Sequence, residues 1–193
     1  MIAHIEGILE SKLPNQVVID VNGIGYLLHI SLNTYESLPS KGKLRLYSHL
    51  IVREDAHLLF GFAEEKERTM FRELINVSGV GANTALMILS SMKPDEVILA
   101  VDQSNVDAFK SIKGIGLKSA QRIIVDLKGK LEKIESISEF LSSQDNTLKN
   151  EALSALVVLG IEKKKATKAI DEILSNTEVA SVEELIKLTL KAV

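Results

Sequence analysis

The chain has 193 residues, of which 46% are hydrophobic and 25% are charged, and its formal net charge at pH 7 is −3. The composition is ordinary for a globular protein, and the lack of cysteine excludes disulfides and thiolate metal sites. No apolar run reaches the roughly 18 residues of a membrane span, and the first residues do not form a secretory signal, so we expect a cytoplasmic protein.

Residues 1–63 have the two-residue apolar repeat of half-buried strands. Asn22-Gly23 and residues 39–42 provide turn chemistry between the runs. About five strands in some 60 residues predict a small closed or nearly closed β-barrel. The repeat is clearest at Val17, Ile19 and Val21, at Tyr26, Leu28 and Ile30, and at Leu44, Leu46 and Leu50.

Residues 64–135 change to the three- and four-residue spacing of helices. Pro94 suits the first turn of a helix that continues to Val101. Ser104 with Asp107 resembles a capping box for a short helix that ends at Ser111. The apolar stripes consist of Met70, Phe71, Leu74 and Ile75 near the start of this region, and of Leu117, Ala120, Ile124, Leu127 and Leu131 near its end.

Residues 136–147, SISEFLSSQDNT, are rich in Ser, Asp and Asn, and we expect them to form a flexible linker. Three helical patterns follow, at 148–159, 162–174 and 182–192. Gly160 is placed to end the first helix, and Ser181 with Glu184 to begin the third. Because a unit of this size is near the lower limit for independent folding, we expect an adaptor and not an active site.

The segment VSGVGANTALMIL, which begins at Val77, is repeated 35 residues later as IKGIGLKSAQRII, which begins at Ile112. In both copies a Gly-apolar-Gly corner separates two helical patterns, which predicts two helix-hairpin-helix motifs. The glycines leave no Cβ in front of the backbone amides, and the unpaired N–H groups of the following helix carry a partial positive charge. The corners therefore predict phosphate binding without sequence readout.

Other interpretations of these glycines are weaker. The spacing matches neither the dinucleotide fingerprint nor the Walker loop, so we expect no ATP and no nucleotide cofactor. A helix-turn-helix corner without a ligand is the alternative for one copy, and the repetition disfavours it.

A basic patch surrounds the second copy. Seven Lys and Arg residues between Lys110 and Lys133 stand against Asp126 and Glu132, which gives a local charge of +5 in a chain that is acidic overall. Such a patch favours a polyanion as ligand. Lys118 and Arg122 lie on one helical face beside the corner. The alternative is a solvated face on which Arg122 pairs with Asp126.

From MIAHIEG through VREDAHLLFGF and both glycine corners to the last helices, the chain resembles the RuvA family, the Holliday-junction-binding subunits of the bacterial branch-migration complex. The resemblance implies an α+β multidomain protein. Its parts are an OB-fold barrel at 1–63, a helical domain with two helix-hairpin-helix motifs at 64–135, the linker at 136–147, and a mobile three-helix, UBA-like domain at 148–193.

The resemblance also implies an assembly and partners. The assembly is a homotetramer, or on DNA an octamer, that holds a four-way junction open and square-planar. The third domain would recruit RuvB, a hexameric ATPase, and the resolvase RuvC would be a further partner. The implied processes are homologous recombination, DNA repair and the SOS response to DNA damage.

The DNA-binding residues that the resemblance implies lie in and beside the two glycine corners. Glu54 and Asp55 fall in the stretch that resembles the family's acidic pin. Carboxylates there would repel phosphates near the crossover. Family members usually have Lys at the position of Asn83, so we expect the first hairpin to hold phosphate more weakly. The DNA-binding set is Gly79, Val80, Gly81, Asn83 and Thr84 in the first copy, and Lys113, Gly114, Ile115, Gly116, Lys118, Ser119 and Arg122 in the second.

In the third domain, Leu156, Leu159 and Ile161 form a candidate apolar patch for RuvB. The alternative is that all three belong to the core of that small domain.

Two other function classes are open. Helix-hairpin-helix motifs also occur in DNA repair enzymes, both nucleases and glycosylases. The histidines at 4, 29, 49 and 57 lack the spacing of metal ligands, however, and adjacent carboxylates on a strand point to opposite sides. A protein–protein scaffold would not need the basic residues at 110–133. We therefore expect no catalytic residue, no metal site and no cofactor.

Overall fold

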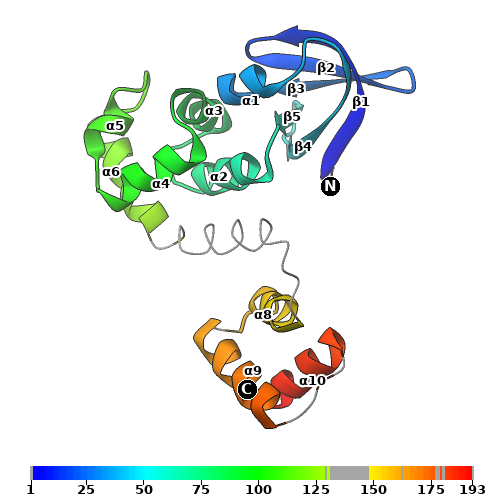
Figure 1. Cartoon of the computed structure of the whole chain (residues 1–193). Helices are drawn as coiled ribbons and strands as arrows, with labels where there is room; N and C mark the ends of the chain where they lie inside the picture. The colour runs from blue at the N-terminus through cyan, green and yellow to red at the C-terminus, as the bar shows by residue number, and fades with distance from the viewer. Residues whose placement is uncertain are drawn as a thin grey trace. The chain divides into compact units, whose positions relative to one another are not determined.

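The computed structural model describes residues 2–128, 130, 148–161, 163–176, 179 and 181–192 (Figure 1). The chain divides into two compact units, Met1–Ile134 and Glu135–Val193. The linker expected at 136–147 lies outside the described residues, as do Leu131 and Lys133. Within the described ranges, no helix is both long enough and apolar enough to cross a membrane.

The N-terminal part is a closed five-stranded barrel, as expected. The strands close in the order β1-β2-β3-β5-β4, and all neighbours are antiparallel except β3 and β5. The predicted alternation is confirmed, because Val17, Ile19, Leu28 and Leu46 are fully buried. The strands are β1 (His4–Leu13), β2 (Gln16–Val21), β3 (Ile24–His29), β4 (Gly42–Val52) and β5 (His57–Phe62).

A short helix, α1 (Leu32–Ser37), lies between β3 and β4 and is not predicted by the sequence pattern. Ser31 is its N-cap, and the Ser31 hydroxyl accepts a hydrogen bond from the amide of Thr34 at 3.0 Å. Six residues are too few for a helix that is stable by itself, so contacts with the rest of the protein must hold it.

Five helices follow β5: α2 (Glu65–Ile75), α3 (Ala82–Ser91), α4 (Pro94–Asp102), α5 (Val106–Lys110) and α6 (Leu117–Lys128). Pro94 occupies the first turn of α4, as predicted. The predicted start of α5 is wrong by one residue. Asn105 is the N-cap, and its side chain accepts from the amide of Ala108, whereas Ser104 has a φ of 52°. An asparagine oxygen caps as well as a serine oxygen, so the two candidates cannot be separated by type.

The stripe expected on α6 also needs one correction. Ala120, Ile124 and Leu127 are buried, but Leu117 is 52% exposed at the first position of the helix. Ile123, fully buried, takes its place in the core. The first residue of α6 therefore faces solvent and not the core.

The barrel has a hydrophobic core of its own, and its last strand also contributes to the core of the helices. Phe60 and Phe62, at the end of β5, belong to the same buried cluster as the apolar faces of the five helices. The ring centroid of Phe71 on α2 lies 4.9 Å from that of Phe60 and 5.0 Å from that of Phe62, distances typical of favourable aromatic pairs. The boundary between the two cores therefore lies before the change of sequence pattern at residue 63, because β5 contributes to the helical core.

The C-terminal unit contains the three expected helices, α8 (Leu148–Val158), α9 (Lys163–Asn176) and α10 (Val182–Ala192). Gly160 lies just after the end of α8 and has a φ of 90°. The amide of Ile161 donates to the carbonyl of Leu156 at 3.0 Å. Ser181 caps α10, because its hydroxyl accepts from the amide of Glu184 at 3.2 Å. The small core is formed by Ala152, Leu156, Ala166, Ile170 and Leu185.

Candidate nucleic-acid interface

The first helix-hairpin-helix motif consists of α2, the turn at 76–81 and α3. In the turn, the amide of Val77 donates to the carbonyl of Leu74, and the amide of Val80 donates to the carbonyl of Val77, both at 3.0 Å. Gly79 has a φ of 89°, a conformation that side chains with a Cβ rarely adopt. Gly81 is the N-cap of α3, with φ −85° and ψ 171°.

The second motif, α5, the turn at 111–116 and α6, repeats these bonds at an offset of 35 residues. The amides of Ile112 and Ile115 donate to the carbonyls of Phe109 and Ile112, each at 3.1 Å. Gly114 has a φ of 86°, and the carbonyl of Gly116 accepts from the amide of Ala120 at 2.9 Å. The prediction of two helix-hairpin-helix motifs is confirmed.

Gly81 and Gly116 leave an open surface in front of two helix N-termini. A Cβ built on either glycine would meet no atom within 4 Å, and the φ of Gly81 is one that any residue adopts. Neither internal packing nor backbone conformation requires a glycine at position 81. The empty space is instead suited to an external group that approaches the backbone.

The amides behind these glycines are available. Among the described residues, the amides of Ala82, Asn83 and Thr84 donate to no backbone carbonyl outside the helix and to no capping side chain. The same holds for the first three residues of α6, 117–119. Unpaired N–H groups at a helix N-terminus carry partial positive charge and bind anions such as phosphate.

Val80 and Ile115 do not fit the DNA-contact role expected for them. Each side chain is 5% exposed, and each amide donates within its own turn. Neither group is free to contact a ligand. Both residues instead anchor the turn on the hydrophobic core, which explains why the residue between the two glycines is apolar.

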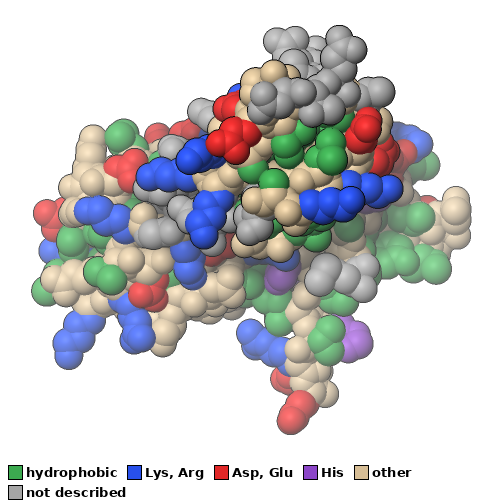
Figure 2. Space-filling view, turned by 90° about the horizontal axis from the view of Figure 1, so that it is seen from below, with side chains coloured by type: hydrophobic (Ala, Val, Ile, Leu, Met, Phe, Trp, Pro, Cys, Tyr) green, Lys and Arg blue, Asp and Glu red, His purple; other side chains and the backbone are tan. Residues whose placement is uncertain are grey.

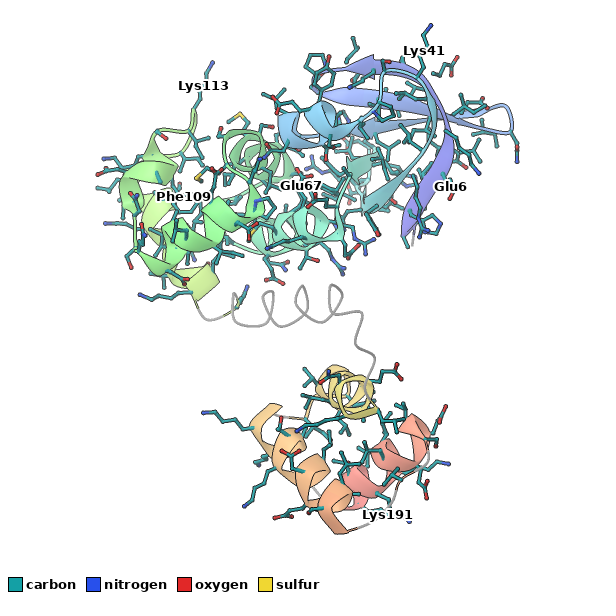
Figure 3. The ribbon with its side chains drawn as sticks, in the orientation of Figure 1. Glu6, Lys41, Glu67, Phe109, Lys113 and Lys191 are labelled. Carbon is teal, nitrogen blue, oxygen red and sulfur yellow. The ribbon has the colours of Figure 1, made fainter. Side chains whose placement is uncertain are left out.

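The two hairpins differ in side-chain charge. Asn83 is exposed and Thr84 partly exposed in the first, and no Lys or Arg occurs between Arg72 and Lys93. In the second, Lys113 projects outward from the turn (Figure 3) and Lys118 is exposed. Within the described part of the chain, neither Lys113 nor Lys118 forms an ion pair. Ser119, the counterpart of Thr84, is partly exposed.

The basic patch is less concentrated than its sequence suggests. Lys110 pairs with Asp107 at 2.9 Å, and Lys130 lies 3.7 Å from Glu73 of α2. Arg122 lies 3.9 Å from Asp126, as in the alternative interpretation, but its side chain is 58% exposed and this contact is loose. The lysines at 113 and 118 are therefore the clearest cations beside the second corner.

Glu54 and Asp55 lie in the turn between β4 and β5, and both are exposed. The amide of Arg53 donates to the carbonyl of Ala56 at 2.8 Å and closes this turn. Figure 2 shows a narrow projection with acidic side chains at its end and basic and histidine side chains behind them, which matches the composition of residues 53–57. We call residues 53–56 the acidic tip.

In the C-terminal unit, the expected apolar patch is only partly exposed. Leu156 is fully buried in the small core, so it presents no surface to a partner. Ile161 is partly buried against the same core, whereas Leu159 is 62% exposed. The alternative interpretation therefore holds for Leu156, and only Leu159 and the exposed part of Ile161 are available for binding.

A buried polar cluster joins α1 to α2. Glu67 is 4% exposed, and its carboxylate accepts hydrogen bonds from the hydroxyls of Ser31 and Thr34, the latter at 2.6 Å. Burial raises the pKa of Glu67, while the two hydroxyl groups oppose that shift. In the sequence, Glu67 lies on the same helical face as Met70, Phe71 and Leu74, which is a signal of a buried carboxylate. No local pattern identifies its partners, Ser31 and Thr34.

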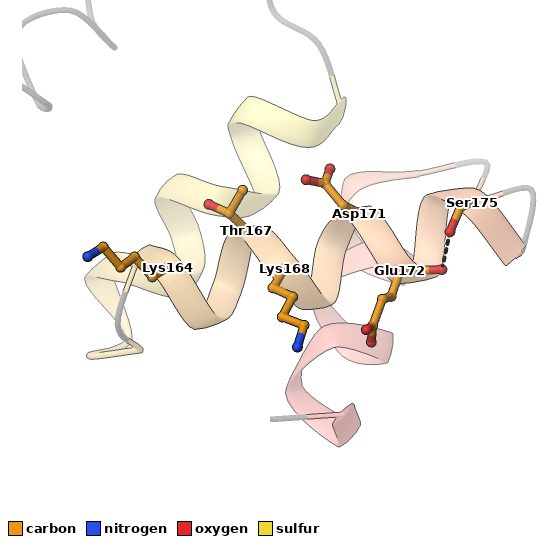
Figure 4. A pocket seen from close by; sticks show the side chains of 6 residues that line it. All are labelled: Lys164, Thr167, Lys168, Asp171, Glu172 and Ser175. Atoms are coloured by element: carbon orange, nitrogen blue, oxygen red, sulfur yellow. Dashed lines mark hydrogen bonds between the residues drawn. The ribbon is translucent and has the colours of Figure 1, made fainter.

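A shallow depression on α9 does not form a catalytic site (Figure 4). All of its lining residues come from one helix, so no opposing wall brings a second set of groups against them. Across the described residues there is also no group of three or more His, Cys, Asp or Glu side chains suited to hold a metal ion. The lining residues are Lys164, Thr167, Lys168, Asp171, Glu172 and Ser175.

Similarity to known proteins extends over nearly the whole chain. Family models match for the RuvA N terminal domain at residues 1–61, a SAM-like helix-hairpin-helix tandem at 71–130, and the RuvA C-terminal domain at 147–193. Relatives from Flavobacterium psychrophilum, Christiangramia forsetii and Bacteroides fragilis are 50%, 49% and 42% identical, with 99% of each chain covered. Each of the three is named Holliday junction branch migration complex subunit RuvA. The chain belongs to the RuvA family.

Proposed function

We propose that the chain is a non-catalytic DNA-binding subunit that holds four-way DNA junctions open for branch migration. The observation that carries the proposal is the pair of glycine corners, in which free helix amides lie behind an open glycine surface. Such amides contact phosphates and not base edges, so binding is independent of sequence. The name shared by the relatives refers to this junction and supports it as the substrate.

In this proposal the two hairpins grip phosphates by different means. The first uses the amides after Gly81 and the hydroxyl of Thr84. The second adds the ammonium groups of Lys113 and Lys118, with Ser119 and the exposed part of Arg122 nearby. We expect the second hairpin to bind phosphate more strongly, because each ammonium group adds a charge-assisted contact.

The acidic tip would lie at the crossover, where Glu54 and Asp55 repel the converging backbones. Two unit charges about 4 Å apart repel by about 1 kcal/mol in water and by about 4 kcal/mol near a protein surface. This repulsion penalises a continuous duplex that would occupy the centre, and it helps to hold the strands of an open junction apart.

We further propose that the chain acts as a homotetramer, because a junction has four arms and a fourfold ring would give each arm the same hairpins. A second tetramer on the other face of the junction would give the octamer. The C-terminal unit would recruit the RuvB ATPase through Leu159 and Ile161, and RuvC would resolve the same junction. With these partners, the proposed role is in recombination, DNA repair and the SOS response, in the cytoplasm.

The alternative functions are less well supported. A metal-dependent nuclease needs converging ligands, and the described residues contain no group of three or more His, Cys, Asp or Glu side chains suited to a metal ion. A glycosylase needs in addition a pocket for the flipped base. A scaffold in which the corners only pack against protein does not explain the open surface at Gly81 and Gly116.

The test is a gel-shift comparison of a four-way junction and a linear duplex of equal length and composition, at several salt concentrations. We expect tighter binding to the junction and a steep loss of affinity for both DNAs with salt. Equal affinity for the two DNAs would show that the junction assignment is wrong. Strand cleavage after incubation with Mg²⁺ would restore the nuclease alternative.

A further inference from the structure

Helix α1 of the barrel is bonded to both helices of the first motif. Toward α2, the hydroxyls of Ser31 and Thr34 donate to Glu67. Toward α3, the side-chain amide of Asn33 donates to the carbonyl of Leu89 and to that of Met92, the latter at 3.3 Å. The amide of Leu32 also donates to the hydroxyl of Ser90 at 3.0 Å. The helices on either side of the first hairpin are thus attached to the same six-residue element.

The bonds to Glu67 are directional. The Ser31 hydroxyl already accepts from the amide of Thr34 at 3.0 Å, and the Thr34 hydroxyl accepts from the amide of Ala63 at 3.1 Å. Both hydroxyl protons are therefore free to point at the carboxylate, and both carboxylate oxygens serve as acceptors. An amide in place of the carboxylate would leave one of these hydroxyls without its acceptor in a buried site.

Helix α2 has a second attachment to the barrel, formed by Arg68, the residue after Glu67. The guanidinium of Arg68 donates to the carbonyl of Ala3 at 2.7 Å and to that of Ser48 on β4 at 3.3 Å. Helix α2 is therefore bonded to the barrel through two consecutive side chains, and it leads directly into the first hairpin.

The second motif has no comparable attachment. Its side-chain hydrogen bonds within the described residues stay inside the helical region. Lys110 donates to Asp107, Ser111 to the carbonyl of Ala108, the amide of Ala108 to the side chain of Asn105, and Lys128 to Ser104. Helices α5 and α6 form no hydrogen bond to the barrel in the part of the chain that is described. The second hairpin nevertheless has the two lysines, 113 and 118, that lack ion-pair partners among the described residues.

From this asymmetry we infer that the two hairpins have separate tasks. The first, attached to the barrel through Glu67 and Asn33, sets where the phosphate backbone lies relative to the acidic tip, and so determines selectivity for junctions. The second supplies most of the phosphate affinity. Glu67 and Asn33 are positioning residues that do not contact DNA. The inference rests on the proposed function and adds a division of labour to it.

The first experiment separates selectivity from affinity. Glu67→Gln and Asn33→Ala are expected to lower the ratio of duplex to junction dissociation constants by about fivefold, the effect of roughly 1 kcal/mol of lost coupling, with duplex affinity unchanged. Lys118→Gln is expected to raise the dissociation constants for duplex and junction by the same factor. Glu36→Gln, an exposed carboxylate on α1, is the matched control and should change neither quantity.

Each result has a distinct meaning. An unchanged ratio in folded Glu67→Gln and Asn33→Ala would overturn the inference, and so would an equal loss of affinity for both DNAs. A ratio of one in the wild-type protein would instead remove the proposed function itself.

A second measurement leaves the contacts of Glu67 and Asn33 intact, because it substitutes only exposed residues elsewhere. The chain has no cysteine, so spin labels can be attached at pairs of introduced cysteines. One pair is Arg53→Cys with Ser78→Cys, and the other is Arg53→Cys with Lys113→Cys. Excess unlabelled chain keeps one labelled subunit per assembly. We expect a narrower distance distribution from the acidic tip to the first hairpin than to the second. Equal widths would overturn the inference.

Discussion

Replacing Gly81 with aspartate should change stability and DNA binding in opposite directions. Gly81 is the N-cap of α3, its φ of −85° suits any residue, and a Cβ there meets no atom within 4 Å. An aspartate carboxylate at the N-cap can accept from the free amide of Thr84. Aspartate is a better cap than glycine by a few tenths of a kcal/mol, and its charge at a helix N-terminus contributes about 0.3–1 kcal/mol. The folded protein should gain about 0.5–1 kcal/mol of stability.

Binding should fall because the new carboxylate takes the place of the phosphate. Hydrogen bonds from an amide to a charged group contribute about 1.5–3 kcal/mol. Repulsion between the carboxylate and a nearby phosphate adds at least about 1 kcal/mol. A loss of about 3 kcal/mol at a first hairpin that contacts DNA corresponds to roughly a 100-fold weaker dissociation constant for the junction. The loss for duplex should be smaller, because the second hairpin supplies most of the phosphate affinity.

The assay combines urea unfolding with fluorescence anisotropy on labelled DNA. Gly81→Ser is the matched variant, because serine caps the helix without a charge and its hydroxyl can donate to a phosphate, so it should gain stability and lose much less affinity. Ser40→Asp, in an exposed loop, controls for the change in net charge. Binding by Gly81→Asp within threefold of wild type, in a protein of equal or greater stability, would refute the phosphate role of this corner.

Three further predictions concern charge. The double substitution Glu54→Gln with Asp55→Asn should raise affinity for duplex more than for junction, so the ratio of their dissociation constants falls; an unchanged ratio by anisotropy would contradict a role for the acidic tip. Lys118→Gln should reduce the slope of log affinity against log salt by about one for each subunit whose Lys118 contacts a phosphate, and a change confined to one DNA would contradict a pure phosphate contact. Because burial raises the pKa of Glu67, its carboxylate binds a proton at a higher pH in the folded chain than in the unfolded chain. The linked stabilisation is present below the usual glutamate pKa and is lost as pH rises through the folded value, so wild type should gain stability relative to Glu67→Gln as pH falls toward that range. A flat or opposite trend in urea midpoints would contradict this.

Local sequence patterns were sufficient for much of the fold and for both hairpins. Alternation at Val17, Ile19 and Leu28 predicts strands because the side-chain period of a strand is two. The repeated Gly-apolar-Gly segments predict equal corners because a positive φ at Gly79 and Gly114 is a local requirement. Such signals are contained within a few residues, so they can be recognised in the sequence without knowledge of the tertiary contacts.

Where local signals compete, the sequence was insufficient. Asn105 and not Ser104 caps α5, although both types cap helices. Val80 and Ile115 are buried anchors, although they lie between glycines that face solvent. Leu156 faces the small core and Leu159 faces solvent, although both are leucines near one turn. In the last two cases the choice depends on which side of the element faces the core.

The sequence by itself determined the barrel, the helical region, the three C-terminal helices and the two corners, because each has a periodicity or a backbone requirement that its own residues contain. Only the tertiary structure decided how the first corner is attached to the barrel. Helix α1 has six residues and no apolar stripe, and Glu67 meets Ser31 and Thr34 across 36 and 33 positions of the chain. A short helix and a buried carboxylate are stable only when their partners are in place, and those partners are brought together by the closed barrel and its packing on α2 and α3.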